Sequence, residues 1–230
     1  MTEFEGQLLE RIVPRLRLAD PVQRALARLA ERGHTGTADL RRLALDNESP
    51  MQSRLDAAII LTAMKEPDEE GIRSLLDCED RTLFVETVKS LRSLSEEWAL
   101  RCVLAAARNS DDPSRRPLFA WALAGYPTSA EAESALLSLA TSDDSPAVRE
   151  HAIESLGEFH SGRVVNVLLD ILAGGPAPER FWALFSLGNL AAPTAAEGVR
   201  GCLQDRTAIP GLGTIAEEAS WALARIQEGG

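Results

Sequence analysis

A repeat of about 32 residues runs through the 230-residue chain and limits its fold more than any other feature. Its anchor is a small residue, usually Ala, which in most copies is followed four positions later by Leu. The anchors are Ala25, Ala57, Thr87, Ala120, Ala152, Ala183 and Ala219, with spacings of 32, 30, 33, 32, 31 and 36 residues. A period between 20 and 50 residues is typical of repeat architectures, in which each copy is one supersecondary unit.

A second series of apolar residues keeps the same period. It consists of Leu43, Leu75, Val103, Leu136, Leu168 and Val199, spaced 32, 28, 33, 32 and 31 residues apart. Both series lie in apolar patterns of helical period. The repeating unit is therefore predicted to be a pair of helices, called here the first helix, which holds the anchor, and the second helix.

Residues typical of helix ends agree with this division. Prolines stand at or near the starts of first helices, at Pro50, Pro113, Pro146 and Pro178. Capping-box spacings are predicted to open second helices, at Ser93/Glu96, Thr128/Glu131 and Thr194/Glu197. Glycines are predicted to end first helices, at Gly33, Gly125 and Gly157. The chain shows no alternating strand pattern, so the predicted fold class is all-α.

The stretch "DDSPAVREHAIESLGEF", followed by "SGRVVNVLLDILAGG", resembles the HEAT repeat in the short variety also found in phycobilin lyases. The residues that carry the resemblance are Pro146, Val148, Arg149, Ala152, Leu156 and Gly157. It extends over about residues 20–227, although the third and seventh units depart from the pattern. The resemblance implies a right-handed α-solenoid of six to seven helix pairs, whose stacked units share one core.

The expected organisation is a single domain over residues 1–230. A capping helix is expected over 1–19 and a closing helix over 214–227, with repeat units at 20–47, 50–78, 80–109, 112–141, 145–173 and 177–205. The long last spacing indicates an inserted loop over residues 205–215, which holds Pro210 and two glycines. This loop is predicted to be the most mobile segment.

Composition narrows the function classes. The formal net charge of −11 argues against a general nucleic-acid binder, because phosphate groups must meet a positive field. The three cysteines, Cys78, Cys102 and Cys202, form no CxxC motif and favour a reducing compartment, so a cytoplasmic location is expected. The first residues lack the apolar core of a signal peptide, and no apolar run is long enough to cross a membrane.

No group of residues points to catalysis or to a metal. His151 and His160 lie nine positions apart across the Gly157 turn, so one helix face cannot present both, and His34 is isolated. The cysteines belong to apolar helices and are expected to be buried. Phosphate-binding and nucleophile motifs are absent from the sequence. We therefore expect a protein that is not an enzyme and has no catalytic residues, metal or cofactor.

The resemblance implies that the second helices line a concave groove and form the binding surface. Counting from the Leu168 column predicts which side chains face this groove. The partner-binding residues predicted in this way are Arg41, Arg73, Trp98, Arg101, Arg163, Asn166, Asp170 and Glu197. Trp121, Trp182 and Trp221, by contrast, are expected to pack between repeats in the first-helix layer.

Three arginines at one position in consecutive units make the N-terminal half of the predicted groove basic. Arg41, Arg73 and Arg101 could pair with neighbouring acids such as Glu70 and Asp77 as a ladder between repeats. They could instead receive an acidic peptide or protein loop. The sequence leaves both interpretations open.

The leading functional hypothesis is a non-catalytic protein–protein interaction solenoid: an adaptor, or an inhibitor such as a bacterial immunity protein. Its partner would be another protein or an acidic peptide segment, and the chain itself a monomer or weak homodimer. One alternative is an enzyme or chaperone subunit like a phycobilin lyase. Another is a DNA-glycosylase-like HEAT protein, with Asp77 and Trp98 beside the arginines, although the net charge argues against it.

Overall fold

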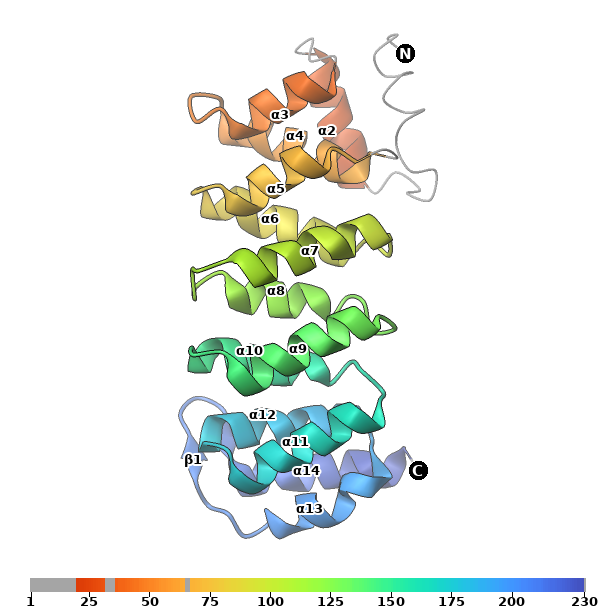
Figure 1. Ribbon diagram of the computed structural model, residues 1–230, viewed down its shortest axis with the longest axis vertical. Helices are drawn as coiled ribbons and strands as arrows, with labels where there is room; N and C mark the ends of the chain where they lie inside the picture. The colour runs from red at the N-terminus through yellow and green to blue at the C-terminus, as the bar shows by residue number, and fades with distance from the viewer. Residues whose placement is uncertain (1–19, 32–35, 65–66, 230) are drawn as a thin grey trace. The chain divides into compact units, whose positions relative to one another are not determined.

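A computed structural model of the chain describes residues 20–31, 36–64 and 67–229 (Figure 1). The expected capping helix over 1–19, together with Gly33 and His34, lies outside the described residues. The chain divides into two compact units, residues 1–109 and 110–230, and each is described by itself.

The described residues of unit 1–109 form three helix pairs. The helices are α2 (Asp20–Glu31), α3 (Thr37–Leu45), α4 (Met51–Ala63), α5 (Glu69–Asp77), α6 (Arg81–Arg92) and α7 (Glu97–Asn109). The first helices α2, α4 and α6 contact one another in one layer, and the second helices α3, α5 and α7 contact one another in the other. Both layers are therefore built from elements one repeat apart in the sequence.

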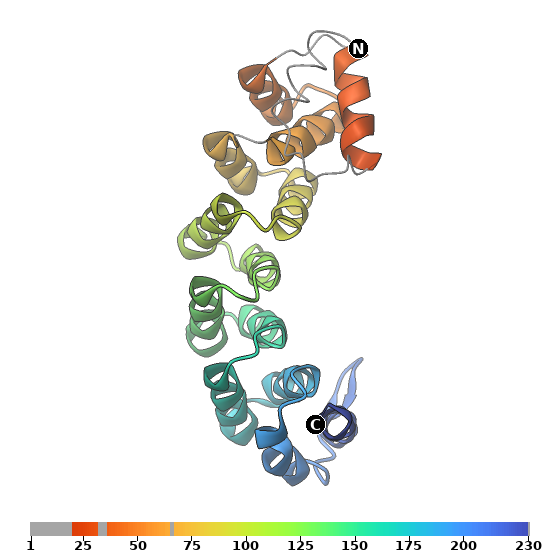
Figure 2. The same cartoon turned by 90° about the vertical axis from the view of Figure 1, so that its right-hand side faces the viewer.

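The described residues of unit 110–230 continue the same pattern with seven α-helices, one short 3₁₀ helix and one small hairpin. They are α8 (Arg116–Leu123), α9 (Ala130–Ser142), α10 (Pro146–Leu156), α11 (Gly162–Gly174), α12 (Ala177–Asn189), the short 3₁₀ helix η1 (Pro193–Ala195), α13 (Ala196–Gly201), strands β1 (Ala208–Ile209) and β2 (Gly213–Thr214), and α14 (Ile215–Glu228). The first-helix layer consists of α8, α10, α12 and α14, and the second-helix layer of α9, α11 and α13 (Figure 2). The all-α solenoid fold is thus confirmed.

Several helices begin at other residues than the sequence predicts. Ser129, not Thr128, is the N-cap of α9, and its hydroxyl accepts a hydrogen bond from the Ala132 amide. Ser93 is the C-cap of α6, and Thr194 lies inside η1. A capping box does form between Thr214 and Glu217 at the start of α14. The spacing S/T-x-x-E also occurs by chance, and neighbouring serines and threonines compete for the cap.

The two apolar series predicted by the repeat form the core. The side chains of Ala57, Ala120, Ala152, Ala183 and Ala219 are fully buried, as are those of Leu75, Val103, Leu136, Leu168 and Val199. Thr87 replaces Ala at the third anchor and is also buried. Its hydroxyl donates to the Leu83 carbonyl oxygen at 2.8 Å, which satisfies the polar group within its own helix.

Small residues bring the first helices of unit 110–230 into close contact. A Cβ added at Gly157 would lie 3.1 Å from Ser186 Oγ, and one at Gly188 would lie 2.5 Å from the Trp221 ring. Ser186, on α12, donates to the carbonyl oxygen of Ile153 on α10 at 2.8 Å. The glycine of the Leu-Gly motif therefore marks the point where the next first helix approaches.

The close approach of the first helices sets the direction in which this unit bends. Contacts between successive first helices (α8–α10, α10–α12 and α12–α14) are more extensive than contacts between successive second helices (α9–α11 and α11–α13). In Figure 2 the second helices of this unit are spread more widely than the first helices. The first-helix layer therefore lies on the inner side of unit 110–230. This differs from the expectation that second helices line the concave side, because Ala and Gly pack closely where the Leu and Val of the second helices cannot.

The inserted segment 205–215 folds into a hairpin. Ala208 and Ile209 pair with Thr214 and Gly213 in antiparallel register, and β1 contacts α12 while β2 contacts α14. Gly211 and Gly213 have φ values of 79° and 126°, which only glycine adopts without strain. The hairpin lies on the first-helix side of the unit (Figure 2), and Leu212 in its turn is 48% exposed.

Asp205 anchors the base of this hairpin. Its carboxylate accepts hydrogen bonds from the Thr207 amide and from Arg180 on α12. Hydrogen bonds from the side chain and amide of Thr207, followed by that from Arg180, lower the pKa of Asp205 to about 2. The carboxylate is therefore charged at neutral pH and ties the hairpin to the first-helix layer.

Candidate functional site

The predicted partner-binding residues lie on the second helices, and most of their side chains are exposed. Arg41 is on α3, Arg73 on α5, and Trp98 and Arg101 on α7, all in unit 1–109. Arg163, Asn166 and Asp170 are on α11 and Glu197 is on α13, in unit 110–230. Arg41 and Trp98 are half-buried and the other six are exposed. Counting along the second helices thus selects residues whose side chains reach the surface.

The three arginines of unit 1–109 bind acidic residues at and just before the start of α5. Arg41 donates to both carboxylate oxygens of Asp68 and, at 2.8 Å, to Glu70. Glu69 accepts from Arg101 at 3.0 Å and from Arg73 at 3.3 Å. The hydrogen bond with Asp68 is the main cause that raises the pKa of Arg41. The arginine column is therefore a ladder of ion pairs, most of which join neighbouring repeats.

A second ladder of ion pairs runs through the first helices, at lower exposure. The pairs are Arg28–Asp56, Arg54–Asp80, Arg116–Asp143, Arg149–Glu179 and Arg180–Asp205. Each arginine reaches an acid 25 to 30 residues later, on the next first helix or in the segment that leads to it. These arginines are bound inside the protein and are not available to a partner.

The predicted residues of unit 110–230 are less constrained. Arg163 donates to the Ser134 hydroxyl at 3.2 Å. Asn166, Asp170 and Glu197 have no hydrogen-bond or ion-pair partner among the residues that the structure describes. They lie on the outer layer of this unit, where the helices are spread apart.

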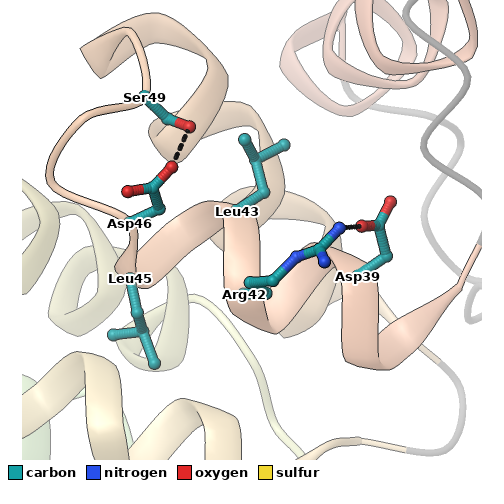
Figure 3. Close-up of a pocket in the computed structure, with 6 residues that line it drawn as sticks. All are labelled: Asp39, Arg42, Leu43, Leu45, Asp46 and Ser49. Atoms are coloured by element: carbon teal, nitrogen blue, oxygen red, sulfur yellow. Dashed lines mark hydrogen bonds and ion pairs between the residues drawn. The ribbon is translucent and has the colours of Figure 1, made fainter.

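A cavity of about 580 Å³ lies against α3 and the turn to α4 (Figure 3). Its lining residues are Asp39, Arg42, Leu43, Leu45, Asp46 and Ser49. The polar side chains bind one another: Arg42 pairs with Asp39 at 2.5 Å, and Ser49 donates to Asp46 at 2.6 Å. The Ser49 and Glu48 hydrogen bonds lower the pKa of Asp46. The cavity therefore presents no free base or nucleophile. A smaller cavity of about 60 Å³ lies between α5 and α7, beside Arg73 and Asp77.

The histidines and cysteines form no reactive group within the described residues. His151 and His160 are both exposed, and a ring nitrogen of His151 lies 2.9 Å from the Ala147 carbonyl oxygen. Cys102 and Cys202 are buried, and burial is the main cause that raises the pKa of the Cys102 thiol. In residues 20–31, 36–64 and 67–229 there is no cluster of His, Cys, Asp and Glu that could hold a metal ion, and no helix long and apolar enough to cross a membrane.

A continuous strip of aromatic side chains lies on the first helices of unit 110–230. Phe181 and Trp182 meet edge to face at 5.6 Å, as do Trp182 and Phe185 at 5.7 Å. Phe185 stacks on Trp221 of α14 at 5.5 Å with an interplanar angle of 11°. Phe181 is buried and Trp182 and Phe185 are half-buried, whereas Trp221 is 37% exposed. We call Trp182, Phe185 and Trp221 the aromatic strip.

The sequence interpretation missed this strip as a surface. It assigned Trp182 and Trp221 to packing between repeats, and their rings do pack against Phe185, but Trp182 is only half-buried and Trp221 is exposed. A signal was present: Trp182 precedes its anchor by one residue, and Phe185 and Trp221 follow theirs by two. In the preceding repeat these two positions hold His151 and Glu154, residue types expected to face solvent.

Comparison with known proteins supports the fold. A family model described as HEAT repeats matches residues 100–188. The chain is similar to the structure of lipovitellin, with a TM-score of 0.58 and 14% identity over 96% of this chain, and it spans 25% of the lipovitellin chain. No match was found among curated protein sequences.

Two further solved structures are similar at lower TM-scores. One is an archaeal HEAT-like repeats protein from Thermococcus onnurineus NA1, with a TM-score of 0.48, 15% identity, and coverage of 97% of each chain. The other is the complex of CpcE and CpcF of phycocyanin lyase from Nostoc sp. PCC7120, with a TM-score of 0.39, 15% identity, and coverage of 98% of this chain and 96% of that chain. Similarity at this level does not bear on what the present chain binds.

The two-helix repeats, the packing at the Leu-Gly motif and the family match agree with one another. A HEAT-repeat family model matches residues 100–188, and the described helices on either side of them form helix pairs of the same kind.

Proposed function

We propose that this chain is a non-catalytic protein-binding solenoid, and that the aromatic strip on α12 and α14 is one of its contact surfaces. The observation that supports it best is the exposure of Trp221 over Phe185 on the inner side of unit 110–230. Contiguous exposed aromatic side chains are enriched at protein interfaces, because they supply large contact area with few rotatable bonds. An adaptor or an inhibitor fits this role.

The predicted second-helix residues are proposed as a second contact surface, limited to those of unit 110–230. In unit 1–109 an acidic segment would have to displace Asp68, Glu69 and Glu70 from the arginines they bind, so this face gains little from an acidic partner. In unit 110–230, Asn166, Asp170 and Glu197 are exposed and unpaired within the described part of the chain, and can contact another protein. The glycosylase alternative gains no support from the described side chains, since Arg41, Arg73 and Arg101, which would meet DNA, are already paired.

Site-specific photo-crosslinking tests this proposal. A photoreactive phenylalanine analogue is placed at position 182 in one variant and at position 166 in another, and both are irradiated in lysate of the source cells. We expect position 182 to crosslink one protein that mass spectrometry identifies, and Trp221→Ser to abolish that product. Crosslinking from position 166 alone would show that the partner binds the second helices and not the aromatic strip. No protein product from either position, while the intact variants remain folded, would overturn the protein-binding function.

A further inference from the structure

The aromatic strip lies between two carboxylates that bind no cation. Counted from the anchors, His151, Trp182 and Glu218 occupy one position in successive first helices, and Glu154, Phe185 and Trp221 occupy another. Because α10, α12 and α14 pack side by side, Glu154 and Glu218 lie on the two flanks of the strip. Neither carboxylate has an ion-pair or hydrogen-bond partner among the described residues.

Glu218 is half-buried beside α12 without a compensating donor. Burial alone raises the pKa of its carboxyl group. A carboxylate in this position is stabilised by any cation that approaches it, because the cation replaces the solvation that burial removes. The carboxylate of Glu218 therefore lies beside the strip without a cationic partner among the described residues.

The arginines on α10, α12 and α14 each bind another acid. Arg149 is bound to Glu179 at 2.8 Å and to the Asp143 carbonyl oxygen at 2.8 Å. Arg180 is bound to Asp205 at the hairpin. Arg225, on α14, pairs with Glu228 at 3.9 Å. Residues 110–230 hold eight arginines and no lysine against sixteen acidic residues, which gives a formal charge of −8.

We propose that the first-helix face of unit 110–230 binds an arginine- or lysine-bearing segment of a partner protein, with its cations over the rings of Trp182 and Trp221 and beside Glu154 and Glu218. This proposal rests on the proposed function and adds the chemistry of the partner. Indole faces carry negative charge and attract cations, most strongly where the site is partly desolvated. Flanking carboxylates add charge-assisted hydrogen bonds, and the negative charge of the unit increases the rate of encounter.

The same features reject other classes of ligand. An acidic segment or a nucleic acid would meet Glu154, Glu218 and the overall negative charge of the unit, and like charges across an interface disfavour binding. A purely apolar segment would cover the aromatic rings but would leave both carboxylates desolvated and unpaired. An arginine- or lysine-bearing segment satisfies both requirements, because the aliphatic stem of each side chain covers a ring while its charged end meets a carboxylate.

Fluorescence anisotropy with labelled peptides on the full chain tests the proposal. The probe is a short peptide of alternating arginine and serine, and the comparison peptide carries glutamate in place of arginine. We expect the arginine peptide alone to bind, to lose affinity as salt is raised, and to change tryptophan fluorescence. Removing both flanking charges with Glu154→Gln and Glu218→Gln should weaken binding roughly tenfold, because each partly screened ion pair contributes about 0.5–1 kcal/mol.

A matched double variant tests whether binding depends on the first-helix face or on the second-helix face of the unit. Glu131→Gln and Glu133→Gln remove one exposed and one half-buried charge from α9, in the second-helix layer of the same unit, and should leave the affinity within about twofold of wild type. Trp221→Leu keeps an apolar cover over α12 and should reduce affinity about threefold to tenfold by removing the cation–π contact. Equal binding of both peptides, or a loss confined to the second-helix variant, would overturn the proposal. If position 182 crosslinks a partner while the arginine peptide fails to bind, the protein-binding function stands and the cationic chemistry is wrong.

Discussion

At the scale of single residues, the ion pair between Arg149 and Glu179 shows what the repeat motif encodes. Arg149 follows Val148 in the motif that resembles HEAT repeats, and its guanidinium donates to Glu179 of the next repeat at 2.9 Å. The carboxylate side chain of Glu179 is only 9% exposed. Removing one partner of such a pair leaves the other charge buried and unpaired. This lowers the free energy of unfolding by more than the intact pair contributes to it.

We therefore predict that Arg149→Met destabilises the protein by about 2–4 kcal/mol, because the Glu179 carboxylate loses its cation in a buried setting. The free energy of unfolding is measured by urea denaturation followed by circular dichroism. The double variant Arg149→Met with Glu179→Leu should recover at least half of the loss, since both buried charges are then removed. A single variant that unfolds at the wild-type urea concentration would show that the pair is not coupled to the fold.

The sequence identified Arg149 as part of a motif but could not identify its partner. The partner lies 30 residues away, and the acids before and after each anchor offer several candidates of equal chemistry. The same limit applies to Arg41, Arg73 and Arg101. The sequence is compatible with partner binding and with a ladder between repeats, and the contacts with Asp68, Glu69 and Glu70 show the ladder. Periodicity places a side chain on a face, whereas the choice among neighbours depends on distances of a few ångströms.

At the scale of elements, the helices could be predicted well and their ends less well. Two apolar series with one period place the helical core, because burial requires 3.6-residue periodicity regardless of context. Caps depend on one hydroxyl or carboxylate among several, so Ser129 replaced Thr128 and the capping box formed at Thr214. The segment 205–215 was expected to be a loop. It became a hairpin because Gly211 and Gly213 permit the turn, and Asp205 fixes its base.

The contact between α12 and α14 gives the prediction at this scale. Gly188→Ala would place a methyl group 2.5 Å from the Trp221 ring and 3.0 Å from Ala222 Cα. Overpacking of this kind costs about 1–3 kcal/mol, because the helices must separate to accommodate the extra carbon. We expect a lower thermal unfolding temperature and a red shift of tryptophan emission as Trp221 becomes more exposed.

Gly174→Ala is the matched control for this change. Gly174 ends α11, and a Cβ there would meet nothing within 4 Å. Its substitution should be neutral or slightly stabilising, since Ala loses less conformational freedom on folding than Gly. Equal stability of the Gly188 and Gly174 variants would contradict the close approach of α14 to α12.

At the scale of the whole molecule, the sequence predicted the α-solenoid but not which layer of unit 110–230 lies inside. Stacked helix pairs follow from repetition alone, because one pair cannot bury its apolar face. The direction of bending depends on how side-chain sizes in one repeat meet those of the next. Ala183, Gly188 and Ser186 allow close contact in the first-helix layer, and this moved the inner surface, with Trp182 and Trp221, away from the predicted second-helix residues.

The division at residue 109 gives the last prediction. Residues 110–230 form a compact unit with its own buried residues, among them Phe119, Leu136, Leu168 and Leu187. In a repeat protein, stability is approximately a sum of terms within repeats and between neighbours, so a unit with several intact interfaces should fold alone. We expect the fragment 110–230 to unfold cooperatively, with a stability on the order of 5–10 kcal/mol and a near-ultraviolet circular dichroism signal from its stacked aromatic residues.

A shorter fragment, 130–230, provides the control for this prediction. It lacks α8, so the face of α10 that packs against α8 becomes exposed. This fragment should unfold at a lower urea concentration and with a shallower transition, because an interface between repeats is lost while the entropy of ordering the remaining helices is unchanged. If 110–230 lacks a near-ultraviolet signal, or is no more stable than 130–230, folding of this half depends on the rest of the chain. If 110–230 does fold alone, it should also bind the arginine peptide, since the aromatic strip and both flanking carboxylates belong to this unit.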